Sequence, residues 1–103
     1  MPGGYILTSG AESDIRGILD YTLNRWGAGQ AEKYVLQFEQ CLKDLVSGQR
    51  SGKTFSTELP EIRVSHCEHH YIFYVRQSDV LAVVAILHES MDLVSRLTDR
   101  LGK

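Results

Sequence analysis

The chain has 103 residues, of which 43% are hydrophobic and 23% charged, and its formal net charge is -2. These values are typical of one small globular domain spanning residues 1–103, and they exclude a disordered chain. The slight negative charge argues against direct sequence-specific binding to nucleic acid, because such proteins carry an excess of Lys and Arg. The opening residues 1–4 lack a signal-peptide pattern, and the longest apolar run, residues 80–87, is too short for a membrane helix. We therefore expect a soluble cytoplasmic protein with no membrane partner.

The first half of the chain predicts a strand followed by two amphipathic helices. Tyr5-Ile6-Leu7 suits a short strand, and Ser9 with Glu12 three residues later fits a capping box at a helix start. Apolar residues recur with helical period up to Trp26, and a second helical stripe runs over residues 31–46. Because only residues 27–29 separate the two stripes, we expect an antiparallel helical hairpin.

The second half changes from helical to alternating periodicity. Residues 62–66, 71–76 and 80–88 are three strand candidates, and the turns expected between them are Glu68-His69 and residues 77–79. Strands joined by such short turns form an antiparallel meander. The predicted fold class is therefore α+β, with an N-terminal strand and a helical hairpin packed on an antiparallel sheet.

The last predicted strand needs cover on both faces, and the C-terminal helix is a candidate to cover one of them. Residues 80–87 are apolar at every position, so both faces of this strand should be covered. The hairpin can cover only one face. A short amphipathic helix with Ser90 as its cap runs to Leu101, and we expect either that it folds back on the sheet or that a partner covers the same surface.

Two clusters of potentially reactive side chains have plainer interpretations. Cys41 and Cys67 each lie in an apolar pattern and are expected as reduced, buried thiols, with a disulfide as the minor alternative. The run of residues 66–70, His-Cys-Glu-His-His, contains metal-ligand types, but its spacing matches no zinc pattern and strand alternation separates neighbours. A polar turn is the favoured interpretation, so no metal and no cofactor is expected.

Four further residues could be structural or functional. His88, next to Glu89, could perform acid–base chemistry or could fix the start of the last helix by hydrogen bonding. Arg63 and Arg76 could converge on an anion or could be solvated charges on a half-exposed sheet. Trp26 at the end of its helix is expected to pack in the core, and an exposed Trp there would instead be a binding anchor.

Several short motifs follow one another along the chain. They are Tyr5-Ile6-Leu7-Thr8, Ala11-Glu12-Ser13-Asp14-Ile15-Arg16, Arg25-Trp26-Gly27 with Gln30-Ala31, Cys67-Glu68-His69-His70-Tyr71 and Val83-Val84-Ala85-Ile86-Leu87-His88-Glu89, which leads into Met91-Asp92-Leu93. Taken together in this order, they resemble the ParE branch of the ParE/RelE toxin superfamily, closest to plasmid-type ParE. The resemblance covers nearly the whole chain, and its weakest parts are residues 2–4 and the loop at 47–57.

This resemblance implies a function that composition cannot show. ParE-like toxins inhibit DNA gyrase by protein–protein interaction and serve in plasmid maintenance. They are neutralised by a ParD-like antitoxin, whose disordered C-terminal part folds onto the toxin. The resemblance therefore implies a binding protein with no catalytic residues. For the gyrase-directed surface we expect Trp26, Arg63 and His88, and for the antitoxin groove Tyr74, Arg76, Leu93 and Leu97.

The alternative is a ribosome-dependent mRNA endoribonuclease of the RelE type. That chemistry needs several basic groups around the phosphates and an acid–base residue. Arg63 and His88 could serve, but the loop before the first meander strand offers only Lys53, and the net charge is negative. A third possibility is a degenerate toxin that only binds its antitoxin.

Overall fold

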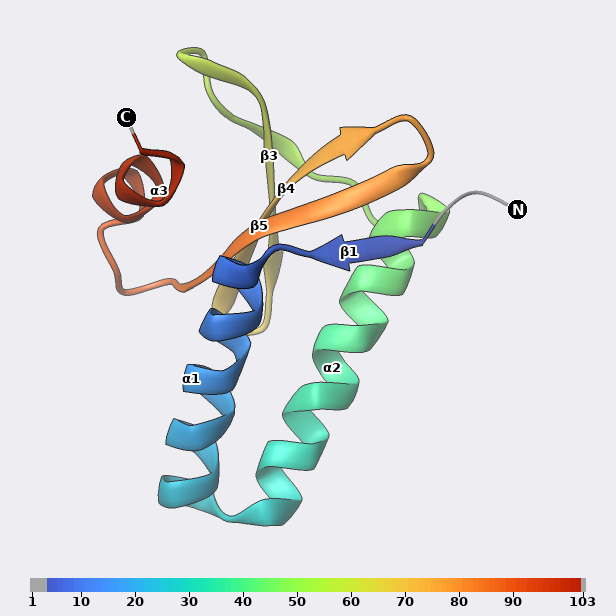
Figure 1. Ribbon diagram of the computed structural model, residues 1–103. Helices are drawn as coiled ribbons and strands as arrows, with labels where there is room; N and C mark the ends of the chain where they lie inside the picture. Colours follow the sequence, from blue (N-terminus) through green and yellow to red (C-terminus); the bar gives the residue numbers. More distant parts are fainter. Residues whose placement is uncertain (1–3, 103) are drawn as a thin grey trace.

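The computed structural model describes residues 4–102 and arranges them around a five-stranded sheet (Figure 1). Strand β1 (Tyr5–Leu7) is followed by helices α1 (Ser9–Trp26) and α2 (Ala28–Ser47). The meander and the last helix are β2 (Lys53–Ser56), β3 (Leu59–Cys67), β4 (His70–Gln77), β5 (Val80–His88) and α3 (Leu93–Leu101). The predicted α+β class, helical hairpin and C-terminal helix are confirmed. None of the helices in residues 4–102 combines the length and apolar character that a membrane span requires.

The sheet differs from the prediction at both of its edges. Its strand order is β1-β5-β4-β3-β2, and β1 runs parallel to β5, with Ile6 opposite Ala82. The expected wholly antiparallel sheet is therefore wrong at this edge, because the hairpin and three strands provide the long crossover that a parallel pair needs. Strand β2 was expected as loop, since its one large apolar residue, Phe55, gives no alternating pattern.

The helical hairpin is closed by a single residue. Gly27 lies between α1 and α2 with a φ of 93°, a conformation that costs a glycine little because it has no Cβ. Its N–H donates to Leu23 O at 3.0 Å, which closes α1. At the other end of α1, Thr8 is the cap, and its Oγ1 accepts from Ala11 N at 3.2 Å. The capping box predicted at Ser9 therefore begins one residue too late.

Both faces of the sheet are covered, as the continuous apolar pattern of β5 predicts. The hairpin packs on one face, and α3 packs on the other, so the C-terminal helix folds back on the sheet. Helix α3 begins after Asp92, not at Ser90, and Asp92 Oδ1 accepts from Ser95 N at 3.3 Å. The hairpin-side core includes Leu45, Ile72, Leu81 and Val83, and the α3-side core includes Ile62, Phe73, Ala85 and Leu97.

One ion pair ties α3 to α1 and to β5. Arg100 makes two hydrogen bonds to the Asp14 carboxylate, at 2.8 and 2.9 Å. Asp14 Oδ2 also accepts from Ile86 N at 2.9 Å, and Arg100 Nη1 donates to Val84 O at 2.9 Å. Beyond the end of β1, these two side chains therefore provide the hydrogen-bond partners for the Ile86 N–H and the Val84 carbonyl at the edge of β5.

A disulfide joins the hairpin to the sheet. Cys41 on α2 and Cys67 at the end of β3 are bonded, with their Cα atoms 6.4 Å apart. Both side chains are buried, as expected, but the expectation of two separate thiols is wrong. The sequence does not reveal the pairing, because it depends on how α2 lies across β3.

Candidate interaction site

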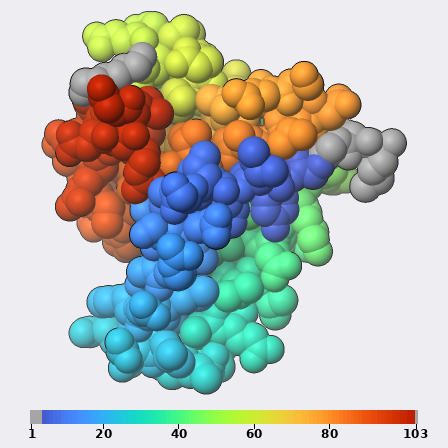
Figure 2. All heavy atoms as spheres, viewed as in Figure 1, coloured from blue at the N-terminus to red at the C-terminus, as the bar shows by residue number. Residues whose placement is uncertain are grey.

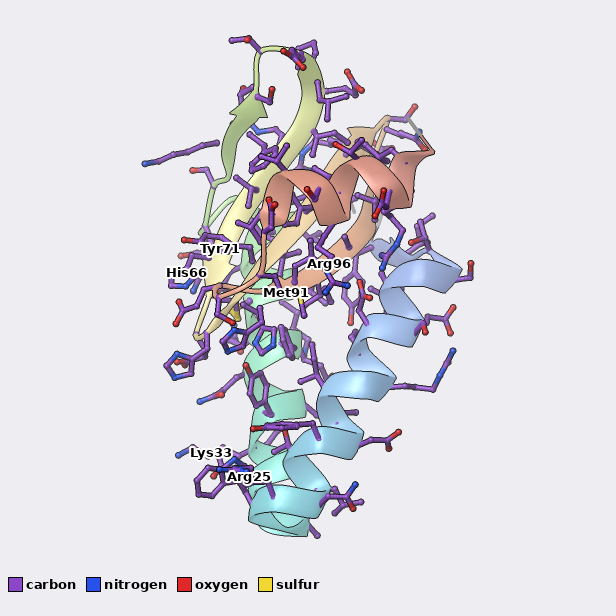
Figure 3. The ribbon with its side chains drawn as sticks, turned by 90° about the vertical axis from the view of Figure 1, so that its left-hand side faces the viewer. Arg25, Lys33, His66, Tyr71, Met91 and Arg96 are labelled. Carbon is purple, nitrogen blue, oxygen red and sulfur yellow. A yellow bond between two sulfur atoms is a disulfide. The ribbon has the colours of Figure 1, made fainter. Side chains whose placement is uncertain are left out.

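An open cavity of about 820 Å³ lies between the helical hairpin and one end of the sheet. Figure 3 faces this side of the molecule, with Met91 between the sheet and the hairpin and with Arg25 and Lys33 near the hairpin's far end. Apolar atoms make up most of the wall. The lining residues are Ser13, Asp14, Gly17, Ile18, Tyr21, Thr22, Trp26, Gln30, Tyr34, His69, His70, His88, Ser90 and Met91.

Helix α1 provides a smooth wall. Ser13, Gly17 and Tyr21 are four residues apart, so they form one row along the helix. Apart from the neighbouring residues and the backbone of α1 itself, no atom of residues 4–102 lies within 4 Å of the position where a Cβ on Gly17 would stand. The small residues therefore leave this face of α1 open to a partner, and Tyr21, 62% exposed, closes the row.

Trp26 lies at the far end of the hairpin and is 66% exposed. The expectation that it packs in the core is therefore wrong. The guanidinium of Arg25 stands 5.9 Å from the centroid of the Trp26 ring, within cation–π range. In Figure 1 the end of the hairpin extends beyond the sheet, which explains why no strand covers this side chain.

The floor of the cavity is formed by the half-buried Tyr34 and the buried His70. Tyr34 Oη and His70 Nδ1 share a short hydrogen bond, and Phe38 stacks on Tyr34 with ring centroids 4.9 Å apart. Burial, together with neighbours such as His88, lowers the pKa of His70 to about 4. Burial, and then the negative charges of Glu68 and Glu89, raise the pKa of Tyr34 to about 12. Both side chains are therefore uncharged near neutral pH, and the floor suits an apolar group.

The rim beside the sheet is polar. His66 Nε2 lies 2.9 Å from Glu89 Oε1, and His69 Nδ1 lies 3.2 Å from Glu89 Oε2. The hydrogen bond with His66, followed by that with His69, holds the pKa of the Glu89 carboxyl below its usual value. Within residues 4–102 no group of three or more His, Cys, Asp or Glu side chains is arranged to hold a metal ion. The run at 66–70 forms the predicted turn, and Cys67 is occupied by its disulfide.

The structure brings together two of the three residues expected to contact the target. Trp26 and His88 both line the cavity, and His88 Nδ1 bonds Ser90 Oγ at 2.7 Å. Arg63 does not join them, and its Nη2 donates to Gly52 O at 2.6 Å. Arg63 pairs with Tyr74, four residues along β4 from the partner of His88, a separation of about 13 Å along the strand. The role of all three stays a prediction.

The four residues expected in the antitoxin groove do not form one surface. Tyr74 is 2% exposed and its Oη accepts from Gly52 N at 3.0 Å, while Arg76 Nη2 donates to Leu45 O at 2.9 Å. Both therefore serve the hairpin side of the sheet. Leu93 and Leu97 pack in the α3-side core, on the opposite face. Their contact with an antitoxin stays untested, and in this structure they contact their own chain.

Sequence reasoning missed most of the cavity wall. Tyr21, Tyr34, His70 and Met91 were not expected in a site. The row of Ser13, Gly17 and Tyr21 was the available signal, because a glycine in mid-helix lowers helix stability and needs a reason in packing or binding.

Comparison with known proteins gives the chain its class. Residues 5–93 match the family described as "ParE toxin of type II toxin-antitoxin system, parDE". The "Toxin ParE" of Escherichia coli is 48% identical over 98 residues, covering 94% of this chain and 95% of the relative. The "Toxin ParE1" of Mycobacterium tuberculosis is 30% identical, covering 90% of this chain and 96% of the relative. The protein is thus a toxin of the type II toxin–antitoxin class.

Within that class, the chain belongs to the ParE toxin family. Two solved structures share its fold. The chromosomal ParDE system from P. aeruginosa aligns with a TM-score of 0.68 at 20% identity, covering 82% of this chain and 94% of that one. The toxin–antitoxin complex RelBE2 from Mycobacterium tuberculosis aligns with a TM-score of 0.58 at 14% identity, covering 85% and 99%.

Proposed function

We propose that this ParE-family toxin inhibits DNA gyrase by protein–protein contact, acts in the cytoplasm, and is neutralised by a ParD-like antitoxin that covers the cavity. The target contact is made across the cavity, through Trp26 on the hairpin and His88 at the end of β5. The antitoxin's disordered segment folds over the same surface and so competes with the target. No bond is made or broken by the toxin itself.

The exposed aromatic wall of the cavity carries this proposal. Tyr21, Trp26 and Met91 are 62%, 66% and 41% exposed and line one hollow of about 820 Å³. Large exposed apolar side chains around one hollow mark an interaction site, and Trp and Tyr are enriched among the residues that dominate binding energy. The neutral Tyr34–His70 floor suits an apolar anchor from a protein partner.

The arrangement gives little support to the RNase alternative. Arg63 is bonded to a backbone carbonyl and lies about 13 Å along the sheet from the position opposite His88. His88 is itself bonded to Ser90, and His70 is held neutral in its pair with Tyr34. Phosphodiester cleavage would require cationic groups converging on one proton-transfer residue.

A supercoiling assay with purified DNA gyrase tests the proposal. The wild-type toxin should inhibit supercoiling, and a purified ParD-like antitoxin should restore it. Trp26→Ala should raise the half-inhibitory concentration about 30-fold, the effect of losing a hot-spot side chain worth about 2 kcal/mol. The matched control is Leu36→Ala, which removes a side chain 60% exposed on α2 but outside the cavity lining, and it should change the value less than twofold.

Two results would contradict the proposal. The first is supercoiling that proceeds unchanged at every excess of toxin. The second is position-specific mRNA cleavage in the ribosomal A site that is lost in Arg63→Ala or His88→Ala, which would establish the RNase reading instead.

A further inference from the structure

The disulfide lies on the same helix face as the cavity floor. Tyr34, Phe38 and Cys41 follow one another on α2 at spacings of four and three residues, so they share one face of the helix. Tyr34 and Phe38 contact His70, the first residue of β4. Cys41 is bonded to Cys67, which pairs with His70 across the turn. The bond therefore holds the part of α2 that positions the floor.

The bond is well protected in the closed structure. Cys41 is 7% exposed and Cys67 is 1% exposed. Thiol–disulfide exchange requires a thiolate to contact one of the two sulfur atoms. A reductant can therefore react only when α2 separates locally from β3 and exposes the bond. Reduction of this bond and opening of the hairpin–sheet junction are therefore coupled events.

We propose that the Cys41–Cys67 disulfide is a redox-controlled brace of the cavity, and that its oxidised form binds the antitoxin more tightly than its reduced form. The proposal rests on the function proposed above. If the disulfide already holds the cavity floor in place, fewer side chains must be ordered when the antitoxin binds, so the binding free energy is more favourable. Disulfides that form in a reducing cytoplasm are usually transient and redox-sensing, which agrees with a regulatory role.

The chemistry is ordinary thiol–disulfide exchange with a low-molecular-weight thiol, RSH. In reduction, two RSH molecules and the Cys41–Cys67 disulfide give two protein thiols and RSSR, with two electrons and two protons passing from the RSH molecules to the protein sulfurs. In oxidation, RSSR accepts the two electrons and two RSH are released. Each direction passes through a mixed disulfide between RSH and one cysteine.

The test compares the full chain in its oxidised form, in its chemically reduced form, and as Cys41→Ser/Cys67→Ser, which cannot form the bond. Mass spectrometry verifies the redox state. The probe is a purified ParD-like antitoxin, titrated by calorimetry. The oxidised form should bind about tenfold more tightly than the other two. This factor corresponds to the conformational entropy of one or two side chains that no longer has to be lost on binding. Amide hydrogen exchange in residues 28–41 of the free toxin should be slower in the oxidised form.

Three outcomes would overturn the proposal. The first is equal affinity of the oxidised and reduced wild-type protein, within twofold, which does not depend on how well the double variant folds. The second is hydrogen exchange in residues 28–41 that does not respond to redox state. The third is failure of every form to bind the probe, which refutes the proposed neutralisation itself and the regulation with it. The exchange measurement on the free toxin separates the third outcome from the second.

Discussion

The Asp14–Arg100 pair offers the sharpest test of how the fold is held together. Asp14 accepts two hydrogen bonds from Arg100 and one from the backbone N–H of Ile86, a residue that is 2% exposed. The Asp14 side chain is 15% exposed and that of Arg100 is 29% exposed, so water screens the pair only partly. Removing Asp14 therefore breaks a charge-assisted pair and leaves a buried donor without its acceptor.

Two substitutions at Asp14 separate these contributions. Asp14→Ala loses the ion pair, worth about 1.5–3 kcal/mol, and leaves the Ile86 N–H unsatisfied at a cost of about 1–3 kcal/mol. Because such costs are not additive, we expect a loss of about 3 kcal/mol in the free energy of unfolding. Asp14→Asn keeps an amide oxygen that can accept from the Ile86 N–H and loses only the negative charge. We therefore expect it to lower the free energy of unfolding by about 1.5 kcal/mol.

Urea unfolding followed by circular dichroism measures both values from the shift in midpoint at constant slope. The matched control is Asp20→Ala, which removes an exposed carboxylate from the same helix and should change stability by less than about 0.5 kcal/mol. Equal losses for Asp14→Ala and Asp14→Asn would show that the bond to Ile86 contributes nothing. Losses at the level of the control would refute the view that this pair fastens α3 and completes the edge of β5.

Three further predictions concern stability. Cys41→Ser/Cys67→Ser should lower the free energy of unfolding by about 3.5 kcal/mol under oxidising conditions, since the bond closes a loop with a sequence separation of 26, and a reductant should then have no further effect. The pKa of His70 is lowered to about 4 in the folded protein, so the unfolded chain binds the proton more tightly. The free energy of unfolding should therefore be highest above pH 6.5 and should fall by up to about 3 kcal/mol as the pH drops toward 4. His70→Gln should reduce this pH dependence in acid-unfolding curves. Gly52→Ala should cost about 1–3 kcal/mol, as its Cβ would stand 2.9 Å from a backbone oxygen of β3, whereas Gly29→Ala, on open helix surface, should be neutral or slightly stabilising in the same thermal melts.

The sequence predicts the order of elements well because each helix and strand has a strong period of its own. The turns follow from polar residues between apolar runs: the turn at Glu68-His69 was predicted, and the one predicted over residues 77–79 is shorter, because Gln77 still belongs to β4. Glu68 and Ser78 have positive φ values of 56° and 53°. Two of the predictions that fail depend on contacts between distant segments. The parallel pairing of β1 and the bond between Cys41 and Cys67 are set by where the hairpin lies on the sheet, and no local pattern encodes that position.

Most of the cavity wall was not predicted, for the same reason. Trp26 was expected to pack in the core, with a binding anchor as the alternative, because it lies on an apolar stripe. The stripe does not show how far the sheet extends along the hairpin, and the structure leaves Trp26 exposed. Tyr74 and Leu97 were expected in the antitoxin groove from the family resemblance, and in this structure both pack within the chain. Apolar periodicity identifies residues that are stabilised by burial. It does not distinguish those buried within the chain from those that remain exposed for a partner.

The open cavity follows from a mismatch in length between the hairpin and the sheet. Helix α1 has 18 residues and is therefore about 27 Å long, and only its first half lies against β5. Ala11 near its start is fully buried, whereas Tyr21 and Trp26 near its end are more than 60% exposed, although all three lie in one amphipathic segment. The space-filling view shows the far end of the hairpin projecting beyond the strands (Figure 2). Within residues 4–102 nothing buries Tyr21 and Trp26 at this end, so a partner that folds over them gains the hydrophobic stabilisation that the isolated domain lacks.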